Sequence, residues 1–252
     1  SYVTNAIEKA RAEADSDKRV EVTIESDVPV GAGLGSSAAV VVATVHAVSN
    51  ELGSEIERER VAEIGHEVEL AVQGSASPAD TFASAMGGMV YVEPDEELRR
   101  LDTPDFDFVV GYDGESAPTG EMVAGVRELV ESNEIAEHVV EDIGDITRLG
   151  VESVESDDLE KTGELMNLGH GLLESLGVGS ASLARMVWAA RDSGAYGAKL
   201  TGAGGGGCIV SLVDDTKIDK VGAGIDVIAD EVYTAQVAEG VRQRYSRLGE
   251  AS

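Results

Sequence analysis

The chain has 252 residues, among them 48 Asp and Glu and 19 Lys and Arg, which gives a formal net charge of −29. Only six of the basic residues are Lys. Such a charge argues against nonspecific binding to nucleic acid or to an anionic membrane, since both would repel the protein. No apolar stretch approaches the ~20 residues that span a bilayer. The single cysteine, Cys208, has no partner for an internal disulfide and no neighbouring zinc ligands. These features predict a cytoplasmic protein without a nucleic-acid or membrane partner.

The excess of carboxylates also suggests the medium in which the protein works. At low ionic strength the charges repel one another, whereas molar salt shortens the Debye length to about 3 Å. Together with the low Lys content, this favours a protein from a salt-loving organism over an ordinary acidic cytosolic protein.

Hydrophobic periodicity predicts the elements of the first hundred residues. The apolar spacing predicts an amphipathic helix over residues 2–10, and the alternation at 20–25 predicts a strand with one wet face. A buried helix over 38–52, a charged helix over 55–73 that ends at Gly74, a helix starting at Ser77 and a strand in GGMVYVEP follow. The acidic stretch 93–107 is predicted to connect two domains.

The second part of the chain is predicted to begin with a strand at 108–112. The apolar pattern then predicts helices at about 119–132, 135–154, 158–175 and 180–193. Two strands flank a glycine-rich loop in GAYGAKLTGAGGGGCIVSLV, and a last helix and strand complete the pattern.

The segment PVGAGLGSSAA, between a predicted strand and a buried helix, is placed to bind an anion. Its glycines allow close approach of the main chain, and the unpaired N–H groups and the helix dipole supply positive potential. The alternative is a tight turn with a helix cap. The segment lacks the Gly-Lys-Ser/Thr ending of a Walker loop and the G-x-G-x-x-G of a dinucleotide fold. We predict a phosphate-binding loop made of Pro29, Val30, Gly31, Ala32, Gly33, Leu34, Gly35, Ser36, Ser37, Ala38 and Ala39.

A second glycine-rich segment, TGAGGGGC, has four consecutive glycines between structured apolar flanks, where a flexible linker would be misplaced. The close backbone approach that these glycines permit predicts a second phosphate contact, and Lys199 and Thr201 are weaker candidates beside it. Cys208 is predicted to pack as a small hydrophobic residue.

These two segments resemble the second and third signatures of the GHMP kinases. HEVELAVQGSASPADTFASAMGG resembles the part of archaeal mevalonate kinases that runs from a magnesium-binding Glu to a catalytic Asp, and the resemblance extends from Ser1 to about Leu212. It implies phosphorylation of (R)-mevalonate to 5-phosphomevalonate in isoprenoid biosynthesis, with ATP as co-substrate and Mg²⁺ as cofactor. Another GHMP kinase, acting on shikimate or homoserine, and an inactive nucleotide-binding homologue are the alternatives.

The resemblance also implies roles for single residues. Ser37 and Glu69 would bind the metal, and Gly204, Gly205 and Gly206 would join the first loop at ATP. Asp80 would accept the proton of the substrate hydroxyl. From the residues alone, Glu69 on the polar side of its helix could be a solvated charge, and Asp80 could complete a capping box with Ser77.

Three further residues, Thr81, Asn167 and His170, are weaker substrate candidates. Asn167 and His170 share a helix face in LMNLGHGLLESLGVGSASLARMV, which resembles the helix pair that borders the substrate pocket in archaeal mevalonate kinases. The alternative for His170 is a hydrogen-bonded histidine at an internal interface.

The fold implied by the resemblance is a two-domain α/β (α+β) fold, and a homodimer is plausible from the family. Residues 1–105 would form an N-terminal domain of the ribosomal-protein-like βαβ type, with a left-handed crossover, and residues 106–252 a ferredoxin-like C-terminal domain. The family's first signature is expected before Ser1, so the N-terminal domain is expected to be incomplete.

Overall fold

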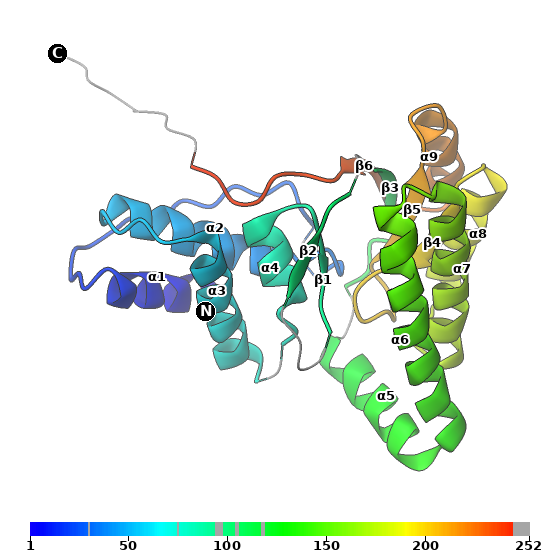
Figure 1. Cartoon of the computed structure of the whole chain (residues 1–252), viewed down its shortest axis with the longest axis horizontal. Coiled ribbons are helices and arrows are strands. Elements are labelled where there is room, and N and C mark those ends of the chain that lie inside the picture. The colour runs from blue at the N-terminus through cyan, green and yellow to red at the C-terminus, as the bar shows by residue number, and fades with distance from the viewer. Residues whose placement is uncertain (30, 75, 94–97, 104–105, 117–118, 244–252) are drawn as a thin grey trace. The chain divides into compact units, whose positions relative to one another are not determined.

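The computed structural model describes residues 1–29, 31–74, 76–93, 98–103, 106–116 and 119–243 (Figure 1). The chain divides into two units. The first contains Ser1–Ser26, Ser37–Arg100 and the segment from Ala238 onward, and the second contains Asp27–Ser36 and Leu101–Val237. The first glycine loop, which is the segment PVGAGLGSSAA that begins at Pro29, therefore belongs to the second unit as far as Ser36. The domain boundary predicted at residue 105 would have placed this loop in the first domain. Residue 105 itself lies outside the described residues.

The described part of the first unit contains four helices: α1 (Tyr2–Glu13), α2 (Ser36–Glu51), α3 (Arg58–Gln73) and α4 (Ala79–Met86). α2 starts at Ser36, the last residue of the neighbouring unit. The core of the first unit consists of small and β-branched side chains, among them Ala6, Val41, Val45, Val61 and Ile64. Burial of these faces, at roughly 25 cal/mol per Å² of apolar surface, is the main force that holds the helices together.

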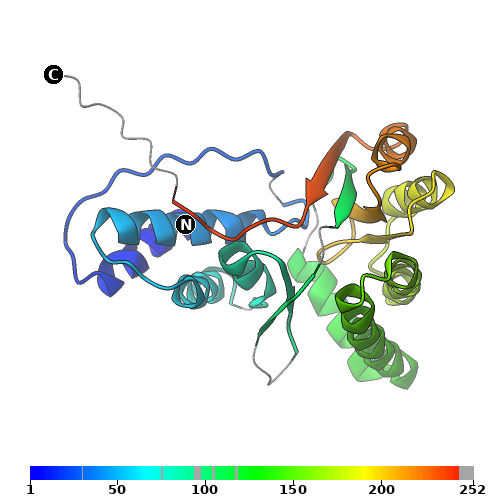
Figure 2. The same cartoon turned by 45° about the horizontal axis from the view of Figure 1, so that its top comes forward.

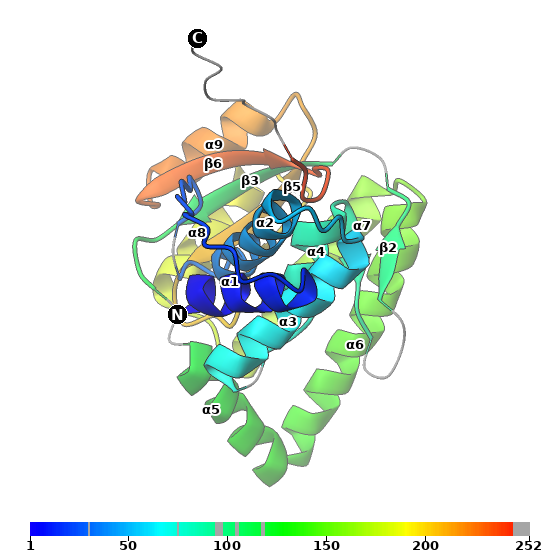
Figure 3. The ribbon, with the colours of Figure 1, turned by 90° about the vertical axis from the view of Figure 1, so that its left-hand side faces the viewer.

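α1 crosses α3, as Figure 3 shows, and charged side chains reinforce this contact. The guanidinium of Arg60 on α3 pairs with Glu13 of α1 at 2.9 Å and with Glu67 at 3.3 Å, while Lys9 of α1 also pairs with Glu67. The predicted end of α3 is confirmed, because Gly74 adopts the left-handed conformation (φ 80°) and donates its N–H to Leu70.

The strand predicted at residues 20–25 does not form in the structure. Val20 and Val22 do pack against the helical core, so the alternation of apolar and polar residues correctly predicted which side chains face the core. A strand, however, also needs a neighbour that takes up its backbone hydrogen bonds, and no ladder to this segment is present among the described residues.

Within the predicted connection at 93–107, the structure has a short strand that the sequence did not reveal. β2 (Arg99–Leu101) pairs with β1 (Met89–Tyr91) in a two-stranded ribbon. The sequence gives no apolar pattern for this strand, because Arg99 and Arg100 are charged and exposed and only Leu101 is buried.

The second unit is built on an antiparallel sheet with the strand order β4-β5-β3-β6. The strands are β3 (Asp107–Tyr112), β4 (Gly197–Leu200), β5 (Cys208–Val213) and β6 (Glu231–Gln236), and Figure 2 shows β6 beside β3. In the centre, Val110 faces Val210 on one side and Tyr233 on the other. This sheet with helices against it agrees with the predicted ferredoxin-like domain.

Helices α8 (Ala181–Asp192) and α9 (Ile218–Asp226) pack against this sheet over a fully buried core that includes Leu183, Met186, Ile209 and Ile225. α7 (Leu159–Ser175) lies along β4, α6 (Glu134–Glu155) lies along α7, and α5 (Thr119–Ser132) contacts α6 (Figure 1). None of the helices in the described ranges combines the length and the apolar character of a membrane span.

α7 approaches β4 closely because two glycines face each other. A Cβ atom on Gly163 would lie 2.3 Å from the carbonyl carbon of Tyr196, and a Cβ on Gly197 would lie 2.2 Å from the oxygen of Gly163. Backbone therefore meets backbone, and any side chain would force the helix away from the sheet.

This contact yields a test of the packing. We expect Gly163→Ala to lower the free energy of unfolding by about 1–3 kcal/mol, because the added methyl group overpacks a rigid backbone contact. Gly171→Ala, on the same helix, is the matched control: nothing lies within 4 Å of its Cβ position, so the change should stabilise the helix by ~1 kcal/mol. Urea unfolding in molar salt measures both, and equal stability of the two variants would contradict the packing described.

Candidate active site

The first glycine loop takes its shape from three alternate glycines. Gly31, Gly33 and Gly35 have φ angles of 74°, 77° and 66°, in the left-handed region that favours glycine. The chain then enters α2 at Ser36, where the first four N–H groups of the helix lack intrahelical partners. The loop thus delivers main-chain donors and the positive end of a helix dipole to one place, which is the physical requirement for binding phosphate. Val30, also predicted here, lies outside the described residues.

The second glycine loop, residues 201–207, lies against the first. The Thr201 hydroxyl donates to the Gly33 carbonyl at 3.0 Å, and a Cβ on Gly202 would lie 2.8 Å from the Cα of Gly33. At the other end of the loop, a Cβ on Gly207 would lie 2.7 Å from the Ala32 oxygen. The two predicted loops are therefore joined, backbone to backbone, within the second unit.

Lys199 and Cys208 lie next to this loop, but their contacts do not support a direct role in binding phosphate. The Lys199 amine donates to the Leu200 carbonyl at 2.9 Å, and loss of hydration lowers its pKa. Cys208 is fully buried, and this burial raises its pKa to about 12, so the thiol stays protonated. The prediction that Cys208 packs as a small hydrophobic residue is confirmed, since it contacts Ala32 and Val110.

The carboxylates lie in the first unit. The Ser37 hydroxyl on α2 donates to Glu69 Oε1 on α3 at 2.9 Å, and only 4% of Glu69 is exposed. The alternative of a solvated charge is therefore wrong for Glu69, because neighbouring helices cover more of α3 than its apolar stripe. Burial raises the pKa of Glu69, and the nearby negative charge of Asp80 raises it further.

Asp80 does not act as a helix cap. α4 begins at Ala79, whose N–H is accepted by the Ser77 hydroxyl at 3.2 Å, and the Asp80 carboxylate has no hydrogen-bond partner among the described residues. Its side chain is accessible to solvent, yet the protein atoms around the carboxyl group remove part of its hydration and raise its pKa. The adjacent Thr81 is fully buried and donates its hydroxyl to the Pro78 carbonyl, which fixes the turn before Asp80.

Asn167 and His170 lie along the free edge of β4. The Asn167 side chain accepts from the Ala198 N–H at 3.1 Å and donates to the Tyr196 carbonyl, while His170 Nδ1 accepts from the Leu200 N–H. These side chains take the backbone bonds that a neighbouring strand would otherwise provide. The contacts support the structural alternative for His170, and they extend it to Asn167.

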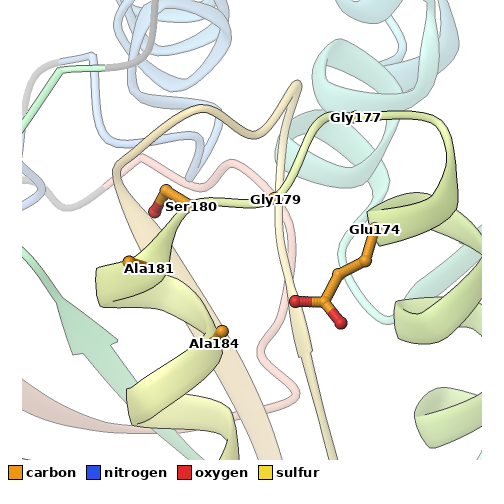
Figure 4. A pocket seen from close by; sticks show the side chains of 6 residues that line it. All are labelled: Glu174, Gly177, Gly179, Ser180, Ala181 and Ala184. Carbon is orange, nitrogen blue, oxygen red and sulfur yellow. The ribbon is translucent and has the colours of Figure 1, made fainter.

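An open pocket of about 310 Å³ lies at the turn between α7 and α8 (Figure 4). Glu174 from α7 and Ser180 at the start of α8 line it with small residues. The Glu174 carboxylate makes this pocket a poor binding place for phosphate. The same turn supports the second glycine loop, because the Gly205 N–H donates to the Val178 carbonyl at 2.8 Å.

Comparison with known proteins assigns the chain to a family. The sequence profile of the GHMP kinases N terminal domain matches residues 1–88, and that of the GHMP kinases C terminal domain matches residues 151–226. The mevalonate kinase of Pyrococcus horikoshii is 45% identical over 241 residues, covering 90% of this chain and 71% of the relative. The mevalonate kinase of Thermococcus gammatolerans is 44% identical over 252 residues, covering 96% and 74%. The chain belongs to the mevalonate kinase family.

The fold agrees with this membership. The crystal structure of the Methanococcus jannaschii mevalonate kinase matches with a TM-score of 0.81 at 26% identity, over 94% of this chain and 76% of that one. Within this mevalonate kinase fold, the first unit holds Ser37, Glu69 and Asp80 close together, and the second unit holds the two glycine loops against each other.

Sequence reasoning missed one polar residue at the glycine loops. Asp113 follows the end of β3 directly and accepts the Gly207 N–H at 2.9 Å. A carboxylate placed immediately after a buried strand was the available signal.

Burial of Glu69 predicts how stability depends on pH. The pKa of Glu69 is higher in the folded protein than in the unfolded chain. Its ionised carboxylate therefore lowers the free energy of unfolding at a pH above the folded-state pKa, and this destabilisation disappears as the pH falls below the unfolded-state pKa. We therefore expect Glu69→Gln to raise the melting temperature at pH 7 in the absence of divalent metal, and to match the unchanged protein near pH 4. Thermal unfolding with a chelator across this range checks it, and a lower melting temperature for the variant at pH 7 would refute the expectation.

Proposed function

We propose that this chain transfers the γ-phosphoryl group of ATP to the 5-hydroxyl of (R)-mevalonate, a step of isoprenoid biosynthesis. The observation that carries the proposal is the buried Ser37–Glu69 pair with the accessible Asp80 carboxylate beside it, in a chain 44–45% identical to mevalonate kinases. A metal site and a base are the two groups that phosphoryl transfer to an alcohol requires in addition to a phosphate cradle.

Ser37 and Glu69 would hold the Mg²⁺ ion. The Glu69 carboxylate is buried without a Lys or Arg partner among the described residues, so a bound cation would offset its cost. Those residues contain no cluster of three carboxylate, His or Cys ligands. Mg²⁺ fits such a sparse oxygen site, because it usually retains water and takes substrate phosphates as further ligands. When bound, it would neutralise charge on the phosphates.

The remaining chemistry belongs to the protein. The N–H groups of residues 31–37 and the glycines at 204–206 would bind phosphate oxygens, at the positive end of α2. Asp80 would accept the proton of the attacking hydroxyl. Its raised pKa makes it a stronger base than an ordinary aspartate, and its freedom from hydrogen bonds among the described residues leaves its oxygens available.

Removing this base tests the assignment. We expect Asp80→Asn to lower kcat by about 10²- to 10⁴-fold, because the amide cannot accept the proton. ATP affinity, measured by calorimetry, should change little. Asp142→Asn, an exposed aspartate on α6, is the control and should keep full turnover. Near-normal kcat in Asp80→Asn would exclude Asp80 as the base.

A panel of alcohols tests the substrate. ADP release is measured in molar salt with mevalonate, phosphomevalonate, shikimate and homoserine, and we expect saturable release with mevalonate alone. Release with a different alcohol would assign another kinase activity, and ATP binding without release for any alcohol would indicate an inactive nucleotide-binding protein.

A further inference from the structure

Asp113 connects three separate parts of the second unit. Its Oδ1 accepts the N–H of Gly207 at 2.9 Å and that of Glu115 at 3.1 Å, and its Oδ2 accepts the Ser182 hydroxyl at 2.5 Å. The backbone takes part as well, because the Asp113 N–H donates to the Gly207 carbonyl at 3.0 Å. Gly207 is thus bound through both its N–H and its carbonyl.

A local turn does not account for these contacts. An aspartate that only shapes its own turn bonds to a backbone N–H two residues ahead, as Asp113 does with Glu115. The bonds to Ser182 and Gly207 instead reach across 69 and 94 positions of the sequence. They join the end of β3 to the first turn of α8 and to the last glycine of the second loop.

The position of the carboxylate limits its repulsion of phosphate. Asp113 lies at the first turn of α8, where the helix dipole stabilises a negative charge, and its oxygens are directed at N–H and O–H donors. Charge-assisted hydrogen bonds of this kind are about twice as strong as neutral ones, so the carboxylate is a firm anchor for Gly204–Gly207, which have no side chains of their own.

The loop depends on such an anchor at this end. Gly207 has a φ of 95° and touches Ala32 of the first loop, while Gly205 is held by the Val178 carbonyl. Without Asp113, the N–H of Gly207 loses its acceptor and the glycines gain conformational freedom, which binding must then remove.

We propose that Asp113 is a positioning residue for nucleotide binding, which sets the conformation of Gly204–Gly207 through the Gly207 N–H. The inference rests on the proposed function, because it assumes that this loop binds the phosphates of ATP. Asp113 itself touches no phosphate in this proposal.

Three variants test the proposal, with ATP affinity measured by calorimetry in molar salt. Asp113→Ala removes the acceptor and should raise the Kd for ATP about tenfold. Asp113→Glu keeps the charge but displaces the carboxylate, and a comparable loss is expected. Asp113→Asn retains an acceptor oxygen and should stay within about threefold of the original Kd. In the ADP-release assay, Asp113→Ala should raise the KM for ATP while the KM for mevalonate stays unchanged.

Asp214→Asn is the matched control. Asp214 follows the opposite end of β5 and also accepts several hydrogen bonds, from Thr216 and Tyr196, so its loss should lower the melting temperature without changing the Kd for ATP. Wild-type affinity in Asp113→Ala would overturn the proposal, as would wild-type affinity in Asp113→Glu if the alanine variant does not fold. Failure of the unchanged protein to bind ATP would refute the proposed function instead.

Discussion

Contact between the backbones of the two glycine loops is the constraint on which the proposed phosphate-binding part of the molecule depends. Segments 168 residues apart meet where Thr201 bonds to the Gly33 carbonyl, and Cβ atoms at Gly202 or Gly207 would lie within 2.8 Å of the opposite backbone. Only glycine permits this approach together with positive φ angles. The sheet serves the contact, since β3, β4 and β5 all end or begin at the second loop or its anchor.

The carboxylate pair carries a cost that the fold alone does not explain. Glu69 is buried, its single hydrogen bond among the described residues comes from Ser37, and the charge of Asp80 opposes its ionisation. In a protein with a net charge of −29, an additional buried negative charge lowers stability further. Sites that break the rules of stable packing in this way are expected where a ligand supplies the compensation, and the proposed function assigns that part to a cation.

The edge of the sheet shows a different use of polar side chains. β4 is an edge strand, and an open edge invites pairing with other chains. Asn167 and His170 from α7 and the guanidinium of Arg191 from α8 bond to its backbone groups, with Arg191 donating to the Ala198 carbonyl at 2.7 Å. Asn167 and His170, which the sequence suggested for substrate, thus cover the edge of the sheet and hold α7 beside β4.

Periodicity and glycine spacing predicted the helices, the strands β1 and β3 to β6 and the two glycine loops, because these signals are local, whereas the candidates Ser37, Glu69 and Asp80 came from the resemblance to archaeal mevalonate kinases. Only the tertiary structure decided that Glu69 is buried, that residues 20–25 form no ladder with the other described residues and that Asp113 bonds to the second loop. Burial and hydrogen-bond partners depend on segments that are distant in sequence. A helix pattern specifies its apolar stripe, but its neighbours determine how much of the polar remainder they cover.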